Sequence, residues 1–140
     1  MKPLSVYLKN PATKQLEIPK EVLVVIKPGF LDKSSQIIDK FARVGFVFKQ
    51  MRTKQLTMGE AKRMYYVHKD EDFYYRLCKY MASGPCLGII FDASGISDPF
   101  KITDELKDRI RDQFGEDDMR NCLHSSDNVE NMKKEMSVFF

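Results

Sequence analysis

The chain contains two histidines, His68 and His124, and either could support nucleophilic chemistry because a neutral imidazole is reactive near pH 7. His68 stands in a charged and polar stretch between two predicted helices, which is typical of a solvent-exposed loop histidine. His124 follows the predicted strand that ends at Leu123 and precedes the polar turn 125–128. Backbone N–H groups at such a turn favour an anionic ligand. On its neighbours alone, a structural or surface role for His124 competes with a functional one.

The cysteines indicate neither a disulfide framework nor a zinc site. Cys78, Cys86 and Cys122 are an odd number and include no C-x-x-C pair. We expect all three to be reduced and buried.

Length and composition predict one globular domain of ordinary kind. The 140 residues are 43% hydrophobic and 31% charged, enough to build a single core. No apolar run approaches the roughly 20 residues that span a bilayer, and no signal peptide is recognisable. We therefore expect an intracellular, cytoplasmic protein without a membrane segment. The net charge of +3 is spread along the chain, which suits a small anion and disfavours a polynucleotide as the main partner.

Hydrophobic periodicity predicts an alternation of strands and helices. The run 22–26 is continuously apolar, as in a central strand buried on both faces. The other predicted elements are a helix from Ser34 or Ser35 to Gly45, a half-buried strand at 46–55, a helix at 57–66 opened by a capping box of Thr57 and Glu60, a helix at 72–81, a strand at 86–91, a helix over 102–114, a strand at 119–123, and a last helix capped by Asp127 with Glu130. This order predicts an α+β fold, a ferredoxin-like four-stranded antiparallel sheet with helices packed on one face.

The first twenty residues have no sustained period and include three prolines. We interpret 1–20 as an N-terminal arm in front of a domain at 21–140.

The segment 111–127, RDQFGEDDMRNCLHSSD, resembles the active-site segment of nucleoside diphosphate kinases. It is most similar to the divergent branch found in ciliary and flagellar proteins, which show an arginine, then F-G or Y-G, then R-N-A-x-H-G-S. Three shorter segments match in the same order, at 25–28, 45–46 and 80–85. Together the matches cover residues 21–140, so the resemblance implies the kinase fold over the whole predicted domain.

The resemblance also implies an activity and a site. Such kinases pass a phosphoryl group from a nucleoside triphosphate, commonly ATP, to a nucleoside diphosphate through a phosphohistidine, with Mg²⁺ on the nucleotide. By matched position, His124 is the implied nucleophile, oriented by Glu135; Lys27 and Tyr65 face the transferred phosphate; Arg111 contacts the phosphates, Asn121 the ribose and Phe73 the base; and Arg120 and Ser126 keep their family types as further nucleotide-binding residues.

Two departures from the family pattern lie near the implied site. Between Pro85 and Arg111 the chain is several residues short, and the missing part holds a phosphate-binding arginine and a threonine in the family. Arg109 or Lys101 are the candidates to replace that arginine. Ser125 stands where the family has glycine. An alternative hypothesis is therefore a weakened or inactive nucleotide-binding scaffold module of a ciliary or flagellar axoneme, with axonemal proteins or a second copy of itself as partner.

A third hypothesis is RNA binding, because 43–48 partly resembles the aromatic strand motif of RNA-recognition domains. The leading glycine of that motif is displaced, and the motif falls on the second predicted strand where RNA-recognition domains carry it on the third. The sequence therefore disfavours a polynucleotide partner.

Overall fold

The computed structural model describes residues 18–140, so residues 1–17 of the predicted N-terminal arm lie outside the described part. The elements are β1 (Glu21–Ile26), η1 (Leu31–Lys33), α3 (Ser34–Arg43), β2 (Val47–Lys54), α4 (Met58–Met64), η2 (Tyr66–His68), α5 (Tyr74–Met81), β3 (Cys86–Asp92), α6 (Pro99–Phe114), β4 (Leu123–Ser125) and α7 (Val129–Phe139). Their order confirms the predicted alternation of strands and helices.

The four strands form one sheet in the order β2-β3-β1-β4, and every neighbouring pair is antiparallel. The apolar run at 22–26 is the interior strand β1, as predicted. The short strand β4 pairs with the end of β1, which places His124 opposite Val25. The register therefore brings His124 beside the turn that follows β1 and carries Lys27.

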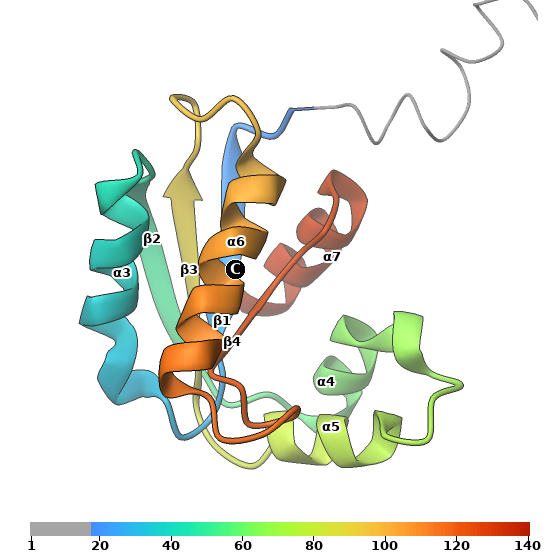
Figure 1. Cartoon of the computed structure of the whole chain (residues 1–140). Coiled ribbons are helices and arrows are strands. Elements are labelled where there is room, and N and C mark those ends of the chain that lie inside the picture. Colours follow the sequence, from blue (N-terminus) through green and yellow to red (C-terminus); the bar gives the residue numbers. More distant parts are fainter. Residues whose placement is uncertain (1–17) are drawn as a thin grey trace, which may run out of the picture.

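Helices cover both faces of this sheet (Figure 1). Val22, Val24 and Ile26 of β1 belong to the core under α3 and α6, whereas Leu23 and Val25 belong to the core formed with α4, α5 and α7. The expectation that the helices lie on one face is wrong. A strand that is apolar on both sides must be covered on both sides, which is what its composition indicates.

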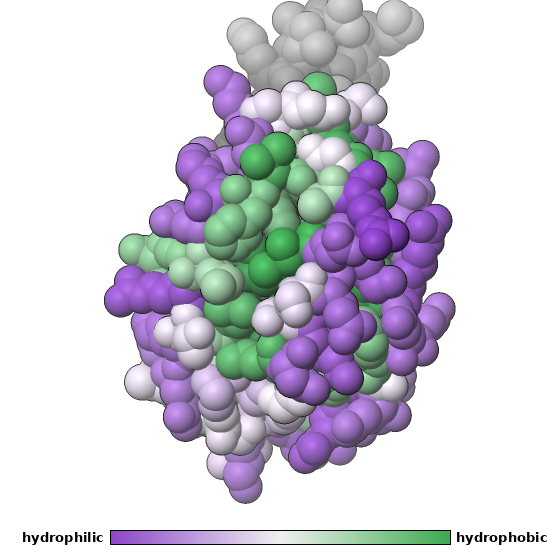
Figure 2. Space-filling view, turned by 90° about the vertical axis from the view of Figure 1, so that its left-hand side faces the viewer, coloured by the Kyte–Doolittle hydropathy of each residue, from purple (hydrophilic) through white to green (hydrophobic). Residues whose placement is uncertain are grey.

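Strand β2 is an exposed edge strand and not the half-buried strand that its pattern predicts. Phe46, just before it, is turned into the core against Phe41, but Val47, Phe48 and Met51 are exposed. Figure 2 shows apolar side chains gathered on this side of the molecule, over α3 and β2. The burial of Phe46 also removes the first aromatic residue of the RNA-binding resemblance from the surface.

The helix starts follow the sequence in part. The capping box is confirmed: Thr57 Oγ1 accepts from the Glu60 N–H, and the Glu60 carboxylate accepts from the Thr57 N–H. The predicted serine cap of α3 is wrong, because Ser34 is already helical and no side chain of the described residues caps that end. No helix within 18–140 is long and apolar enough to cross a membrane.

The segment around β4 and α7 also differs from expectation. The predicted strand 119–123 is wrong, since the strand is Leu123–Ser125 and the residues before it form a loop. Asn128, and not Asp127, caps α7, because its side chain accepts from the Asn131 N–H at 2.8 Å. Moving the strand by a few residues puts His124 inside it.

Candidate active site

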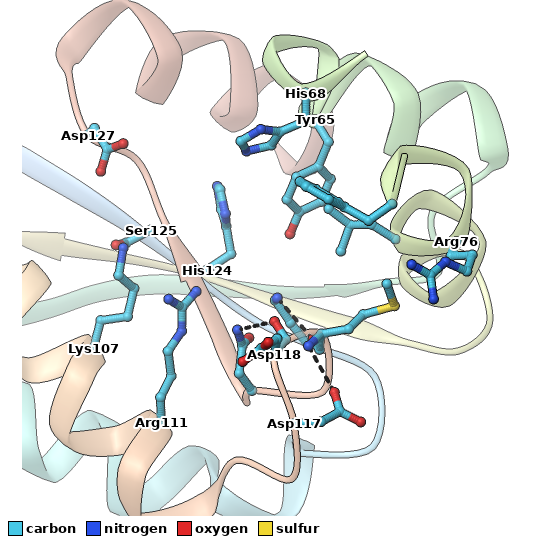
Figure 3. Close-up of a pocket in the computed structure, with 15 residues that line it drawn as sticks. Tyr65, His68, Arg76, Lys107, Arg111, Asp117, Asp118, His124, Ser125 and Asp127 are labelled. Carbon is cyan, nitrogen blue, oxygen red and sulfur yellow. Dashed lines mark hydrogen bonds between the residues drawn. The ribbon is translucent and has the colours of Figure 1, made fainter. Parts of the chain in front are cut away.

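A pocket of about 830 Å³ opens between β4 and α6 on one side and η2 and α5 on the other (Figure 3). Its lining contains most of the predicted site residues, namely Lys27, Tyr65, Phe73, Arg111, Asn121 and His124. These residues come from segments far apart in the chain. The sheet register and the packing of α6 bring them together.

A strained turn leads into the strand that holds His124. Cys122 has a φ of 85°, in the left-handed region that a side chain rarely adopts. Its carbonyl oxygen accepts from the Lys27 N–H at 2.8 Å. This bond ties the turn after β1 to the start of β4, so the positions of Lys27 and His124 are coupled through the backbone.

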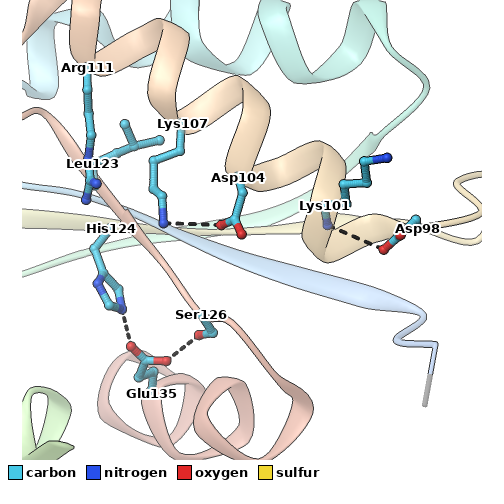
Figure 4. Close-up of polar contacts among 9 residues, drawn as sticks. All are labelled: Asp98, Lys101, Asp104, Lys107, Arg111, Leu123, His124, Ser126 and Glu135. Carbon is cyan, nitrogen blue, oxygen red and sulfur yellow. Dashed lines mark hydrogen bonds and ion pairs between the residues drawn. The ribbon is translucent and has the colours of Figure 1, made fainter. Parts of the chain in front are cut away.

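Glu135 orients the imidazole of His124. Its carboxylate on α7 is 3% exposed and contacts two side chains, His124 through Nε2 and Ser126 through its hydroxyl (Figure 4). A carboxylate accepts hydrogen bonds, so it favours the tautomer in which Nε2 carries the proton. The lone pair then lies on Nδ1, which makes no hydrogen bond to another described residue. This geometry leaves Nδ1 open toward a ligand in the pocket.

Tyr65 packs against this histidine. The two rings are edge-on, with centroids 5.1 Å apart. The tyrosine hydroxyl is buried without a hydrogen-bond partner among residues 18–140, and burial raises its pKa well above the ordinary value. Tyr65 therefore has a neutral O–H group that can donate a hydrogen bond to an anion in the pocket.

Two cationic side chains, buried Lys27 and half-buried Arg111, face the same space. Lys27 is 3% exposed, and its pKa is lowered to about 7, first by burial and then by the charges of Arg111 and Lys107. Arg111 donates two hydrogen bonds to the carbonyl oxygen of Leu123, at 2.9 and 3.3 Å, and burial lowers its pKa as well. Cations that are wholly or partly removed from water and have lowered pKa values indicate a site for an anion that is not part of the protein.

His68 lies in the pocket lining, so the expectation of a solvent-exposed loop histidine is wrong. It ends the short helix η2, is half-buried, and its ring centroid is 5.4 Å from that of Phe73. The spacing of three residues from Tyr65 could have indicated this, because helical turns place such residues on one side. The pair widens the aromatic wall at this end of the pocket.

Some predicted residues lie outside the pocket lining. Ser126 stands behind Glu135, and Arg120 lies over the ring of Tyr80 at 5.5 Å. Lys101 and Arg109, the candidates for the missing arginine, are exposed, and Arg109 lines a separate hollow near Val44.

Residues that the sequence did not indicate as members of the site also line the pocket. They are Lys107, Arg76, Asp117, Asp118 and Asp127, with Ser125 beside them. Lys107 precedes Arg111 by one helical turn, and that spacing on α6 is the signal that could have identified it.

A buried carboxylate hydrogen-bonded to a histidine that shares a pocket with cations is an arrangement typical of proteins that transfer an anionic group covalently. Comparison with known proteins identifies the family. The family model described as nucleoside diphosphate kinase matches residues 20–140. The chain therefore belongs to the nucleoside diphosphate kinase family.

Individual relatives agree with this assignment. The chain is 34% identical to the nucleoside diphosphate kinase of Anaeromyxobacter dehalogenans strain 2CP-C, over 86% of this chain and 88% of the relative. It is 28% identical to the enzyme of Aquifex aeolicus over 86% and 94% of the two chains. A crystal structure of the Aquifex aeolicus enzyme matches with a TM-score of 0.73 at 27% identity, over 86% and 94% of the two chains. The fold is also that of the nucleoside diphosphate kinase from Encephalitozoon cuniculi, with a TM-score of 0.77 at 21% identity over 86% and 88%.

Proposed function

We propose that this protein is a nucleoside diphosphate kinase that transfers the terminal phosphoryl group of a nucleoside triphosphate to a nucleoside diphosphate through phosphorylated His124. The observation that carries the proposal is the hydrogen bond that Nε2 of His124 donates to the buried carboxylate of Glu135, which leaves Nδ1 as the nucleophilic atom.

The reaction has two balanced steps. The Nδ1 lone pair of His124 attacks the terminal phosphorus, and the bond from phosphorus to the bridging oxygen breaks, releasing the diphosphate. A terminal oxygen of a second diphosphate then attacks the same phosphorus, and the phosphorus–nitrogen bond breaks. Positive charge that develops on the imidazole during the first step lies against the Glu135 carboxylate. The second step restores the neutral ring, so the enzyme gains no proton over a cycle.

The remaining roles follow from positions in the pocket. We assign base stacking to Phe73, the ribose to Asn121, and the phosphates to Lys27 and Arg111, with the Tyr65 hydroxyl beside the reacting histidine. Ser126 and Arg120 act from outside the lining. Ser126 holds Glu135, and Arg120 packs on Tyr80 in the neighbouring wall.

Magnesium enters this scheme with the nucleotide. No group of three His, Cys, Asp or Glu side chains within 18–140 is placed to hold a metal ion. Mg²⁺ commonly binds through substrate phosphates and water and needs few protein ligands. Its role is to neutralise charge on the phosphates, while the chain's own residues bind and orient them.

The test is to incubate the purified protein with Mg²⁺ and γ-labelled ATP and to map the acid-labile label by mass spectrometry. We expect the label on His124, none on His68, and complete loss in His124→Ala. If ATP binds but no label forms, phosphotransfer is wrong and a nucleotide-binding scaffold is favoured.

We also propose that the protein associates with itself, through the exposed apolar residues Val44, Val47, Phe48 and Met51. Val47, Phe48 and Met51 belong to the edge strand β2, and Val44 lies just before it. The outer backbone groups of this edge strand are open to pairing. Sedimentation should show a complex that Met51→Lys weakens, and a monomeric wild-type protein would contradict the proposal. The assignment to the ciliary branch, with axonemal partners, rests on the segment 111–127 and stays a prediction that localisation of the tagged protein tests.

A further inference from the structure

Lys107 is directed into the pocket from the middle of α6. It lies one turn before Arg111, its side chain is only 14% exposed, and it lines the pocket with Lys27 and His124. Its amine is 3.2 Å from the carboxylate of Asp104, which is 47% exposed (Figure 4). The carboxylate oxygen nearest the amine is itself buried, so water screens this ion pair little. An ammonium group has three N–H donors, however, and one carboxylate oxygen does not occupy them all. Lys107 therefore keeps donors with which it can bind an anion.

Ser125 offers a hydroxyl in the same region. It follows His124 on β4, is 5% exposed, and lines the pocket. Its Oγ has no hydrogen-bond partner among residues 18–140. Buried hydroxyl groups in proteins are rarely left unpaired, so this one indicates a ligand atom that completes it.

Both residues lie on one side of His124. In the view of Figure 3, Lys107 and Ser125 are on the α6 side of the histidine, and Arg76 of α5 is on the opposite side. The aromatic pair of His68 and Phe73 belongs to the η2 and α5 side. A nucleotide whose base lies against Phe73 would extend its phosphates across His124 toward Lys107.

The positive charges in the pocket also favour phosphates on the α6 side of His124. Lys27 has Arg111 and Lys107 as the two positive neighbours that lower its pKa, so three cations share this part of the pocket. Asp127 also lines the pocket but is exposed, and solvent screens its repulsion of an anion. A multiply charged phosphate relieves the repulsion among the three cations.

The geometry points to Lys107 and Ser125 as the pair that grips the terminal phosphate beside His124, an inference that rests on the proposed kinase function. It explains how the shortened segment between Pro85 and Arg111 serves the site. That segment holds α6, an unbroken helix of 16 residues, and the helix supplies an amine where the family pattern has an arginine. Ser125, on β4, supplies a hydroxyl group in place of that of the missing threonine. Both residues act by binding the phosphate, and neither forms a covalent bond.

The test compares Lys107→Met, Lys107→Arg and Ser125→Ala with the wild type in single-turnover phosphorylation of His124 by ATP. Methionine keeps the apolar stem of lysine, so the core should stay intact. Loss of one preorganised contact commonly lowers such a rate about 10²–10³-fold. We expect a fall of about that size for Lys107→Met, about tenfold for Ser125→Ala, and partial recovery in Lys107→Arg. Lys101→Ala and Arg109→Ala are matched controls from exposed positions of the same helix.

A binding measurement distinguishes an effect on phosphate affinity from an effect on the rate of phosphoryl transfer. Calorimetry should show that Lys107→Met weakens ATP binding at least tenfold and leaves adenosine binding unchanged. If Lys107→Met phosphorylates His124 at the same rate as the wild type, Lys107 does not bind the terminal phosphate, and the proposed kinase function is unaffected. If the wild type fails to phosphorylate His124, the kinase function is wrong. Equal loss of ATP and adenosine binding would also contradict phosphate binding by Lys107, because it would indicate a general structural defect.

Discussion

The Nε2 atom of His124 is hydrogen-bonded to Oε1 of Glu135, and the second carboxylate oxygen accepts from Ser126. The carboxylate is buried in α7, whereas the imidazole stands in β4, so the contact joins the helix to the strand at the centre of the pocket. The relationship fixes both the tautomer and the direction of the ring.

Glu135→Gln should slow phosphorylation of His124 by roughly 10²-fold or more, because an amide can donate to the ring and favour the wrong tautomer. Single-turnover labelling with γ-labelled ATP measures the rate. Glu130→Gln is the matched control, an exposed glutamate on the same helix. A normal rate in Glu135→Gln would show that the hydrogen bond does not prepare the nucleophile.

Lys27 should make nucleotide binding depend on pH. Its pKa is lowered to about 7, first by burial and then by the positive charges of Arg111 and Lys107. A bound phosphate favours the charged amine, so binding above pH 7 takes up a proton. Affinity for ATP should therefore fall as pH rises from 7 to 8.5, by up to roughly tenfold per unit.

Calorimetry in buffers of different ionisation enthalpy measures this proton uptake. Lys27→Arg is the control, because arginine keeps the charge and stays protonated over this range. The nucleotide's own phosphate protons contribute equally to both proteins. Equal proton uptake by the wild type and Lys27→Arg would contradict the assignment of the titrating group to Lys27.

Lys27→Met should stabilise the fold while abolishing activity. The pKa of Lys27 is about 7 when folded and 10.5 as an ordinary lysine, so between these values the unfolded chain binds more protons and stability rises with pH. Removing the buried charge should raise the free energy of unfolding near pH 7.5 by on the order of 2 kcal/mol. The substitution should also reduce the increase in the free energy of unfolding between pH 7 and 8.5.

Urea unfolding at the two pH values tests this, with the exposed Lys133→Met as control. The window stops at pH 8.5 because burial raises the pKa of Cys86 to about 12 and of Cys122 to about 11. Those thiols destabilise the fold at higher pH and would mask the lysine. A less stable Lys27→Met would show that the buried amine supports the fold.

The sequence predicted those parts of the fold that depend on local pattern. The apolar run 22–26, the capping box at Thr57 and the helix over 102–114 all follow from periodicity and cap chemistry, and the structure confirms them. It did not predict that β2 is exposed, because alternation describes a strand without saying whether a neighbour covers it. The position of β4 was missed because three residues carry too little periodicity to mark a strand.

The candidate site shows the same division. Residues near His124 in a recognisable motif were identified directly, and the pocket contains six of those predicted. Lys107 was missed because its place depends on how α6 packs over the sheet, which is a tertiary fact. Lys101 and Arg109 have the same charge on the same helix, but their positions turn them to solvent.

Gly88 of β3 should be essential to the placement of Glu135. A Cβ atom at this position would lie 2.9 Å from the ring of Phe139, which packs on the strand from the end of α7. Gly88→Ala should therefore push α7 away from the sheet and lower the free energy of unfolding by about 1–3 kcal/mol. It should also slow phosphorylation of His124, because Glu135 moves with the helix. Gly95→Ala is the control, since nothing lies within 4 Å of its Cβ position.

The double variant Gly88→Ala with Phe139→Leu should recover both stability and the phosphorylation rate in part, because the smaller leucine side chain makes room for the Cβ atom. Recovery of stability without recovery of the rate would show that the position of α7 does not control the histidine.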